Sequence, residues 1–198
     1  MNRASADQER YAPLAGAVSR APRVRRATID DAPRVAAAGA RLFAQTFDGL
    51  MDPDDIAVYL RATYGPVLQA DELRDPGTAV WIAENEPADA VGFAMLRQRA
   101  LPVPVDPRAV PAARDAVELA RIYVDRAWQG HRVGATLLAA CVSEARAWGG
   151  SMLWLSVWKQ NARAIRFYQR LGLRVVGEQD FVVGSDRQRD HVMVLPLR

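Results

Sequence analysis

The sequence is poor in cysteine, histidine and long apolar runs. Cys141 is its only cysteine, which excludes an intrachain disulfide, and His131 and His191 are too few histidines for a zinc site. Cys141 falls on the apolar face of an expected helix, where a small core residue fits better than a nucleophile. No apolar run approaches the roughly 20 residues that span a bilayer, and residues 1–22 lack the apolar segment of a secretory signal. We therefore expect a cytoplasmic protein without a metal.

Lysine is scarce too, although the chain is slightly basic. Of 26 basic residues against 23 acidic ones, Lys159 is the only lysine, and the arginines are spread along the chain. A nucleic-acid-binding surface would gather them in a stripe, so neither a nucleic acid nor a membrane is expected as partner. The 198 residues, half of them hydrophobic, fit one globular domain.

The first half of the chain combines helices with a hairpin. We predict a disordered tail over residues 1–21 and one domain over 22–198. The expected elements are a strand at 22–28, a helix capped by Asp30 or Asp31 and running to Phe47, a helix starting between Asp52 and Asp55, a short helix at 66–74, and antiparallel strands at 78–84 and 88–98 that turn at 85–87. Residues 100–114 contain four prolines, which predict a long surface loop.

The second half alternates strands with amphipathic helices. The expected elements are a strand at 116–124, a helix at 130–148, a strand at 151–158, a helix at 161–172 ended by Gly172, and a hairpin of 173–184 and 190–197 that turns at 185–189. Residues 151–158 are apolar on both faces, so this strand should be central. The order predicts an α/β fold, a mixed sheet of about seven strands with helices on both faces.

A glycine pair lies at the start of the helix expected at 130–148. Gly130 and Gly134 follow a strand and a short turn, where free backbone N–H groups and the helix dipole can hold a phosphate. Arg132 stands where a phosphate cradle commonly has its middle glycine. The alternatives are a working anion site, a decayed one and an ordinary helix start, and we favour the first because main-chain groups do the binding.

Two spaced motifs carry a family resemblance. Residues 129–134 read Gln-Gly-His-Arg-Val-Gly, and Asn161, Ala164, Tyr168 and Gly172 recur at the spacing Asn-x-x-Ala-x-x-x-Tyr-x-x-x-Gly, followed by Leu173 in place of the usual Phe. The chain thus resembles the Gcn5-related N-acetyltransferase superfamily, which implies an acyl-CoA N-acyltransferase fold with acetyl-CoA as co-substrate. Residues 41–60, 118–138, 155–173 and 177–197 look similar to its bacterial spermidine/spermine branch.

The resemblance implies catalytic roles. An amine attacks a thioester when neutral, yet an alkyl amine titrates near about 10.4, so a base must take its proton. Glu118 precedes Gln129 by eleven positions, as a catalytic glutamate does in some relatives; it is otherwise a charged residue on a strand rim. Tyr123 is a second candidate base. Tyr168 suits the acid that protonates the CoA thiolate, or it is a core aromatic beside Phe167.

Further residues are assigned to the cofactor by the same resemblance. They are Ile122, Tyr123, Val124, Gln129, Gly130, His131, Arg132, Val133, Gly134, Ala135, Asn161, Arg163 and Phe167. A backbone N–H within 122–124 could hold the oxyanion, and Asn161 could bind the pantetheine arm, cap its helix, or do both. We expect His131 to face solvent or phosphate and His191 to be structural, and Arg126, Arg132 and Arg163 are candidate phosphate partners.

The acceptor is an amine of unspecified kind. Asp48, Asp52, Asp54 and Asp55 could form an acidic rim that attracts a polycation, or they could simply be helix caps and first-turn acids. We expect acetyl transfer to a primary amine of a small molecule, a polyamine being one candidate, by direct attack in a ternary complex. The alternatives are acetylation of an antibiotic, an amino acid or a protein N-terminus, and a non-catalytic acyl-CoA sensor. Residues 173–198 offer a surface for a homodimer.

Overall fold

The computed structural model describes residues 21–85, 89–102 and 115–197. Nearly all of the tail predicted at 1–21, the hairpin tip at 86–88 and most of the proline-rich segment at 100–114 lie outside the described residues.

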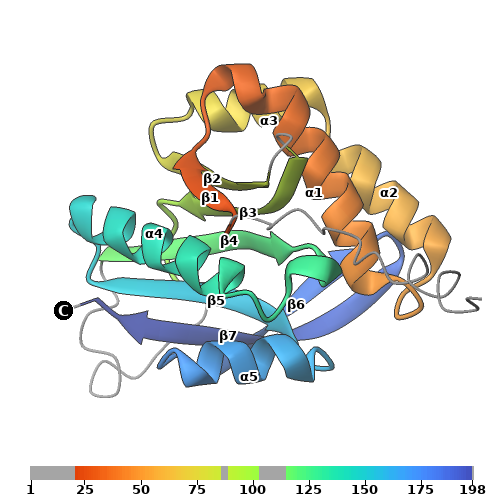
Figure 1. Ribbon diagram of the computed structural model, residues 1–198. Helices are drawn as coiled ribbons and strands as arrows, with labels where there is room; N and C mark the ends of the chain where they lie inside the picture. The colour runs from red at the N-terminus through yellow and green to blue at the C-terminus, as the bar shows by residue number, and fades with distance from the viewer. Residues whose placement is uncertain (1–20, 86–88, 103–114, 198) are drawn as a thin grey trace, which may run out of the picture.

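In the described residues, the sheet has seven strands, and five α-helices connect them in the predicted order (Figure 1). The elements are β1 (Arg23–Arg26), α1 (Ala32–Phe47), α2 (Pro53–Thr63), α3 (Pro66–Arg74), β2 (Thr78–Asn85), β3 (Asp89–Arg97), β4 (Ala116–Val124), α4 (Val133–Ala147), β5 (Met152–Trp158), α5 (Ala162–Arg170), β6 (Arg174–Val183) and β7 (Asp186–Pro196), with 3-10 turns η1 (Ile29–Asp31) and η3 (Arg126–Trp128). The strand order is β1-β2-β3-β4-β5-β7-β6. Among the described strands only the β4–β5 pair is parallel, so the predicted mixed sheet is confirmed.

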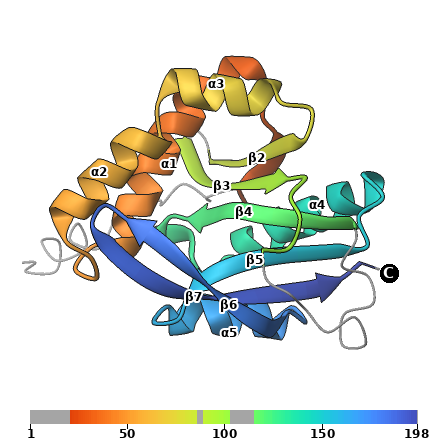
Figure 2. The same ribbon diagram turned by 180° about the vertical axis from the view of Figure 1, so that it is seen from behind.

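Helices cover both faces of the sheet. The α4 and α5 helices pack on one face, over a core that includes Leu137, Leu153 and the fully buried Cys141, which is the core residue expected. The α1, α2 and α3 helices lie on the other face, seen from behind in Figure 2, over a core centred on Phe43 and Phe93. No helix in the described part of the chain is long and apolar enough to cross a membrane.

Strand β4 pairs with β3 over a longer stretch than with β5. Against β3, β4 is paired from Glu118 to Val124, with one irregularity opposite Met95 and Leu96. Against β5 the register covers only residues 116–118 and 152–154. Beyond this point residues 119–124 of β4 and 155–158 of β5, all of them described, share no ladder, and we call this segment the β4–β5 opening. Its closed end is at Glu118.

Two predicted boundaries were wrong. The final hairpin turns at Gly184 and Ser185, not at 185–189, so residues 186–189 belong to β7. Gly184 has a φ of +58°, and a Cβ there would lie 2.2 Å from Asp55 Oδ1 on α2, so the turn is tight. The helix expected from residue 130 begins at Val133, because the preceding residues form the turn described next.

Candidate active site

The turn before α4 keeps the backbone shape of a phosphate cradle. Gly130 has a φ of +90°, and Arg132, the N-cap of α4, has φ +64° and ψ 1°. Arg132 is the only described non-glycine residue with positive φ. Arg132 therefore holds a left-handed backbone conformation that glycine would adopt without strain, at a cost of about 1–2 kcal/mol.

The first turn of α4 presents unused backbone donors. The first helical bond runs from Thr136 N to Arg132 O at 3.0 Å, so the amides of residues 132–135 precede it. Within the described residues no side chain caps this helix end. The Gln129 side chain instead donates to the carbonyl of Val124 at 2.9 Å and ties the turn to the end of β4. These amides and the helix dipole can together bind an anion.

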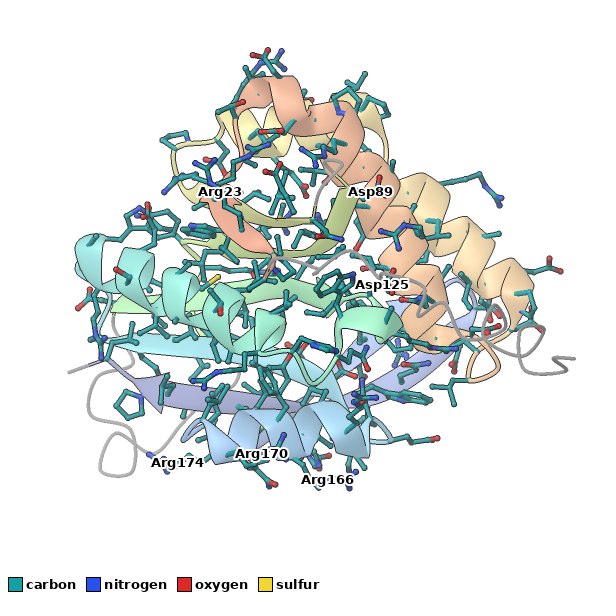
Figure 3. All side chains as sticks on the ribbon, in the orientation of Figure 1. Arg23, Asp89, Asp125, Arg166, Arg170 and Arg174 are labelled. Atoms are coloured by element: carbon teal, nitrogen blue, oxygen red, sulfur yellow. The ribbon has the colours of Figure 1, made fainter. Side chains whose placement is uncertain are left out.

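Asp125 fixes the path from β4 into this turn (Figure 3). Its Oδ1 accepts from Ala127 N at 3.0 Å, and its Oδ2 pairs with Arg41 of α1 at 2.5 Å. Burial raises the pKa of Asp125, but these hydrogen bonds outweigh it and leave the pKa below its usual range. The carboxylate therefore stays ionised and holds the turn in place.

Substitutions of Arg132 test both the backbone strain of the cradle and its binding of CoA. Arg132→Gly should raise the free energy of unfolding by about 1 kcal/mol, because glycine adopts positive φ without strain. For a chain of this size that is a rise of about 2–4 °C in Tm. Affinity for CoA, measured by calorimetry, should fall by less than about tenfold, since main-chain donors remain.

Arg132→Ala is the matched control, because it removes the guanidinium and retains a Cβ at positive φ. It should be no more stable than the wild type. A Tm for Arg132→Gly below that of Arg132→Ala would contradict the strain, and a similar large loss of CoA affinity in both variants would assign the binding to the guanidinium.

Aromatic side chains gather beside the opening on the α4–α5 face. A Cβ on Gly134 would lie 3.4 Å from Phe167 Cζ, so α4 and α5 approach closely here. The rings of Phe167 and Tyr168 are 5.3 Å apart, and Tyr168 lies within electrostatic range of Tyr123 on β4. Burial raises the pKa of Tyr168, whose side chain is 7% exposed. Its phenol therefore stays protonated at neutral pH.

Glu118 lies at the closed end of the opening, on the opposite face of the sheet. It is in register with Arg97 of β3, whose guanidinium reaches Glu72 of α3. Its side chain is 12% exposed; Oε2 is 3.6 Å from Arg99 Nη1, beyond hydrogen-bond range, and has no hydrogen-bond partner among the described residues. Burial raises the pKa of Glu118, and the nearby arginines oppose this less strongly. A carboxyl group tuned toward neutrality suits a general base.

The other residues predicted for the site are distributed over β4, the turn before α4, α4 itself and α5. Asn161 Oδ1 accepts from Ala164 N at 3.1 Å, which confirms its role as N-cap of α5. His131 is exposed and its ring lies against Trp128, as expected for a residue of the turn. Arg163 is exposed on α5, whereas the Arg126 guanidinium donates to Gln45 O of α1 at 2.5 Å rather than facing the cradle. Ile122 and Val124 pack toward α4, while Val133 is buried and Ala135 lies in the first turn of α4.

Basic residues also line the outside of α5. Figure 3 shows Arg166, Arg170 and Arg174 along the solvent side of this helix and the start of β6.

His191 lies within β7, consistent with the structural role expected for it, and its Nδ1 is 3.8 Å from Glu178 Oε1.

The acidic segment after α1 is used largely for local structure. Asp52 caps α2 by accepting from Asp54 N at 2.8 Å, and Asp54 lies in the first turn. Asp55 accepts from Ser185 N at 2.6 Å and so ties α2 to the β6–β7 turn. Asp48 is 4.0 Å from Arg126. These contacts favour caps and connections over an acidic rim dedicated to a polycation.

Two polar side chains that sequence reasoning did not single out are buried on the α1–α3 face of β7. Gln188 and Asp190 are each 5% exposed, and Gln188 Oε1 and Asp190 Oδ1 have no hydrogen-bond partner among the described residues. They alternate with Arg187 and Arg189 and precede Val192 and Val194 on the same buried face. The turn expected at 185–189 conceals this alternation, because residues 186–189 belong to β7.

A model of the acetyltransferase (GNAT) family matches residues 44–173, which include β4, the cradle, the opening and α5. The chain belongs to this family. It is therefore an acetyl-CoA-dependent N-acetyltransferase, with acetyl-CoA as co-substrate.

Relatives agree with this assignment. An uncharacterised N-acetyltransferase of Mycobacterium bovis is 31% identical over 167 residues, covering 84% of this chain and 98% of its own. A spermine/spermidine N(1)-acetyltransferase of Bacillus subtilis is 36% identical over 66 residues, which is 33% of this chain and 43% of that protein. The PaiA N-acetyltransferase of Thermoplasma acidophilum, solved in complex with coenzyme A, shares the fold with a TM-score of 0.69 at 19% identity, over 88% of this chain and 98% of that one.

Proposed function

We propose that the protein transfers the acetyl group of acetyl-CoA to a primary amine of a small molecule by direct attack in a ternary complex. The observation that carries the proposal is the β4–β5 opening, with Glu118 at its closed end on one face of the sheet and Tyr168 beside it on the other. A thioester held in the opening would meet the amine from one face and release the thiolate toward the other. The only cysteine, Cys141, is fully buried in the core, which argues against a covalent acetyl-enzyme.

The cofactor would enter from the α4 side. The amides of residues 132–135 suit its pyrophosphate, and the unpaired edges of β4 and β5 suit the amide groups of the pantetheine arm, as an added strand would. Phe167 borders the arm where α4 and α5 meet. This arrangement brings the acetyl group to the closed end of the opening.

The base would act from the α1–α3 face. Glu118 removes a proton from the acceptor ammonium, and the neutral amine then attacks the thioester carbonyl to form the tetrahedral intermediate. Tyr123 is the weaker candidate, because burial raises its pKa well above the usual value and keeps the phenol protonated. A backbone N–H of residues 122–124 that does not face β3 can stabilise the oxyanion.

The acid would act from the α4–α5 face. Collapse of the intermediate breaks the carbon–sulfur bond, the electron pair passes to sulfur, and Tyr168 gives its proton to the thiolate. The nitrogen of the new amide releases its extra proton to solvent. As the products leave, Glu118 also releases its proton to solvent and the phenolate of Tyr168 regains one. A CoA thiol titrates near about 8.5 in water, and the buried setting raises the pKa of both partners, so the transfer remains feasible.

The proposed reaction requires an amine as acceptor, but it does not specify which amine. The partial likeness to a spermine/spermidine N(1)-acetyltransferase supports a polyamine as one candidate. An antibiotic amine, an amino acid and a protein N-terminus remain the other candidates within the same reaction. A non-catalytic acyl-CoA sensor is the second candidate function, favoured only by the survival of the cradle conformation at Arg132.

Binding and turnover measured in one preparation test the proposal. Acetyl-CoA should bind saturably in calorimetry, and primary amines should then drive release of free thiol. Thiol release that appears only with an amine, together with an acetylated product in mass spectrometry, is the expected result. Binding without release across polyamines, aminoglycosides, amino acids and peptides would favour the sensor, and an absence of binding would contradict the cradle.

A further inference from the structure

We infer that Asp190 and Gln188 form a binding site for a second, non-reacting ammonium group of the acceptor, which makes the acceptor a long diamine or polyamine. The inference rests on the proposed function, because it concerns the amine that Glu118 activates. It assigns substrate selection to the first half of β7 and not to the acidic segment after α1.

The first observation is a pair of buried oxygens without partners. Asp190 Oδ1 and Gln188 Oε1 have less than 1 Å² of accessible surface and no hydrogen bond within the described residues. The Gln188 amide nitrogen is already used, since it donates to Asp186 Oδ2 at 2.6 Å. Unsatisfied buried acceptors are costly, and a carboxylate is more so, which points to a ligand that donates hydrogen bonds.

The Asp190 carboxyl group has Ser156 of β5 as a hydrogen-bond partner and lies within electrostatic range of His191, but it forms no close ion pair among the described residues. No arginine, lysine or histidine forms an ion pair with it in the described ranges, whereas its neighbours Arg187 and Arg189 both pair with Asp180 on the opposite face of the hairpin. His191 follows directly but points to that opposite face, in register with Glu178. An ammonium ion supplies both the missing charge and the missing donors.

Aromatic residues are in register with both Asp190 and Gln188. Asp190 is in register with Trp158 of β5, and Gln188 with Phe181 of β6, so each ring lies beside its polar partner on the same sheet face. Phe47 of α1 approaches Trp158 with 6.2 Å between ring centroids, and Tyr59 of α2 approaches Phe181 at 6.0 Å. Aromatic faces attract cations, so rings together with a carboxylate favour an ammonium group over a neutral donor.

The distance from Glu118 sets the length of the acceptor. Glu118 is in register with Trp154, and Asp190 is in register with Trp158 on the far side of the same strand. Two strand spacings of about 4.8 Å and four residues of about 3.3 Å separate the Cα atoms of Glu118 and Asp190 by roughly 16 Å. A short diamine cannot reach both carboxylates, but a longer diamine or a polyamine can.

The far end of this path meets solvent. A pocket of about 420 Å³ lies at the end of β5 and the start of β7, next to Asp190. Its lining includes Trp158, Gln188 and Asp186, together with the basic residues Lys159, Arg187 and Arg189. The three basic side chains are paired with Glu178 or Asp180. An acceptor longer than the carboxylate spacing could therefore extend outward without a clash.

Matched amine pairs test the site. Linear diamines and polyamines, from putrescine to spermine, are assayed with acetyl-CoA, each against the alkyl monoamine of equal length. The wild type should prefer the long polyamine over its monoamine in kcat/KM, and Asp190→Asn should reduce that preference by about 10- to 100-fold while sparing the monoamine. Spermidine binding to the complex with CoA, followed by calorimetry, should weaken by a similar factor.

Asp180→Asn is the matched control. It removes the same charge from an exposed carboxylate one strand away on the opposite sheet face, and the preference should stay at the wild-type value. A wild type that acetylates monoamines and polyamines equally, or an Asp190→Asn variant of normal Tm that keeps the preference, would overturn the inference and leave the proposed function standing. A protein that acetylates no amine would overturn the proposed function itself.

Discussion

Replacing Tyr168 by phenylalanine is expected to lower kcat about 100-fold and to leave the Kd for acetyl-CoA nearly unchanged. The phenol is the group beside the opening that can protonate the departing thiolate, and general acid catalysis is commonly worth about 10²- to 10⁴-fold. The lower end applies because a thiolate is a good leaving group, its conjugate acid titrating near about 8.5. Pre-steady-state thiol release should slow by the same factor as steady-state turnover.

Thermal stability distinguishes a catalytic role of Tyr168 from a role in core packing. Tyr168 lies in the core beside Leu153 and Leu173, and phenylalanine retains every apolar contact, so Tm should change little. Tyr64→Phe is the control, since Tyr64 is also buried but packs on the α1–α3 face of the sheet, opposite to Tyr168. Equal losses of kcat in the two variants, or none in Tyr168→Phe, would remove Tyr168 from the mechanism.

The elements of the fold could be predicted because their signals are local. Proline in the first turn of α1 and α2, apolar residues at helical spacing in α4 and two-sided apolarity in β5 each act within a few residues. The location of the cradle was indicated by Gly130 and Gly134, but its backbone shape was not, because the second positive φ lies at Arg132 and not at Gly134.

The remainder of the site depends on register, which no local signal fixes. Glu118 lies at the closed end of the β4–β5 opening because the pairing of β4 with β5 ends at this residue. Asp190 lies on the buried face because the β6–β7 turn consists of two residues, which sets the register of β7. This turn is held by a hydrogen bond from Ser185 to Asp55 on α2, 130 positions away in the chain. A one-residue change of register would turn Asp190 to the other face.

Replacing Glu118 by glutamine is expected to lower kcat/KM about 10²- to 10³-fold at pH 7.5. An alkyl amine with a pKa near about 10.4 is neutral in roughly one molecule per thousand at that pH, and without the base only this fraction reacts. Stability should not fall. Burial raises the pKa of Glu118 in the folded protein, so the folded state binds the proton more tightly and ionisation costs stability as the pH rises through that pKa. Glutamine removes this cost at neutral pH, and Tm should be unchanged or higher.

Glu144→Gln is the matched control. Glu144 is a partly buried glutamate on α4, paired with Arg26 and remote from the opening, so kcat/KM should keep its wild-type value and pH dependence. A comparable loss of activity in Glu144→Gln would attribute the effect of Glu118→Gln to a general loss of charge.

The pH profile distinguishes a base from a residue that merely positions the strand. In the wild type, kcat/KM should fall as the pH drops through the raised pKa of Glu118 and should be level above it, because the carboxylate can then deprotonate the bound ammonium. In Glu118→Gln, kcat/KM should rise about tenfold per pH unit up to the pKa of the amine, near about 10.4, where the free amine no longer needs a base. The variant should therefore approach wild-type activity at pH 10. A deficit that is equal at every pH would assign Glu118 a structural role, since a displaced strand would slow neutral and protonated amines alike.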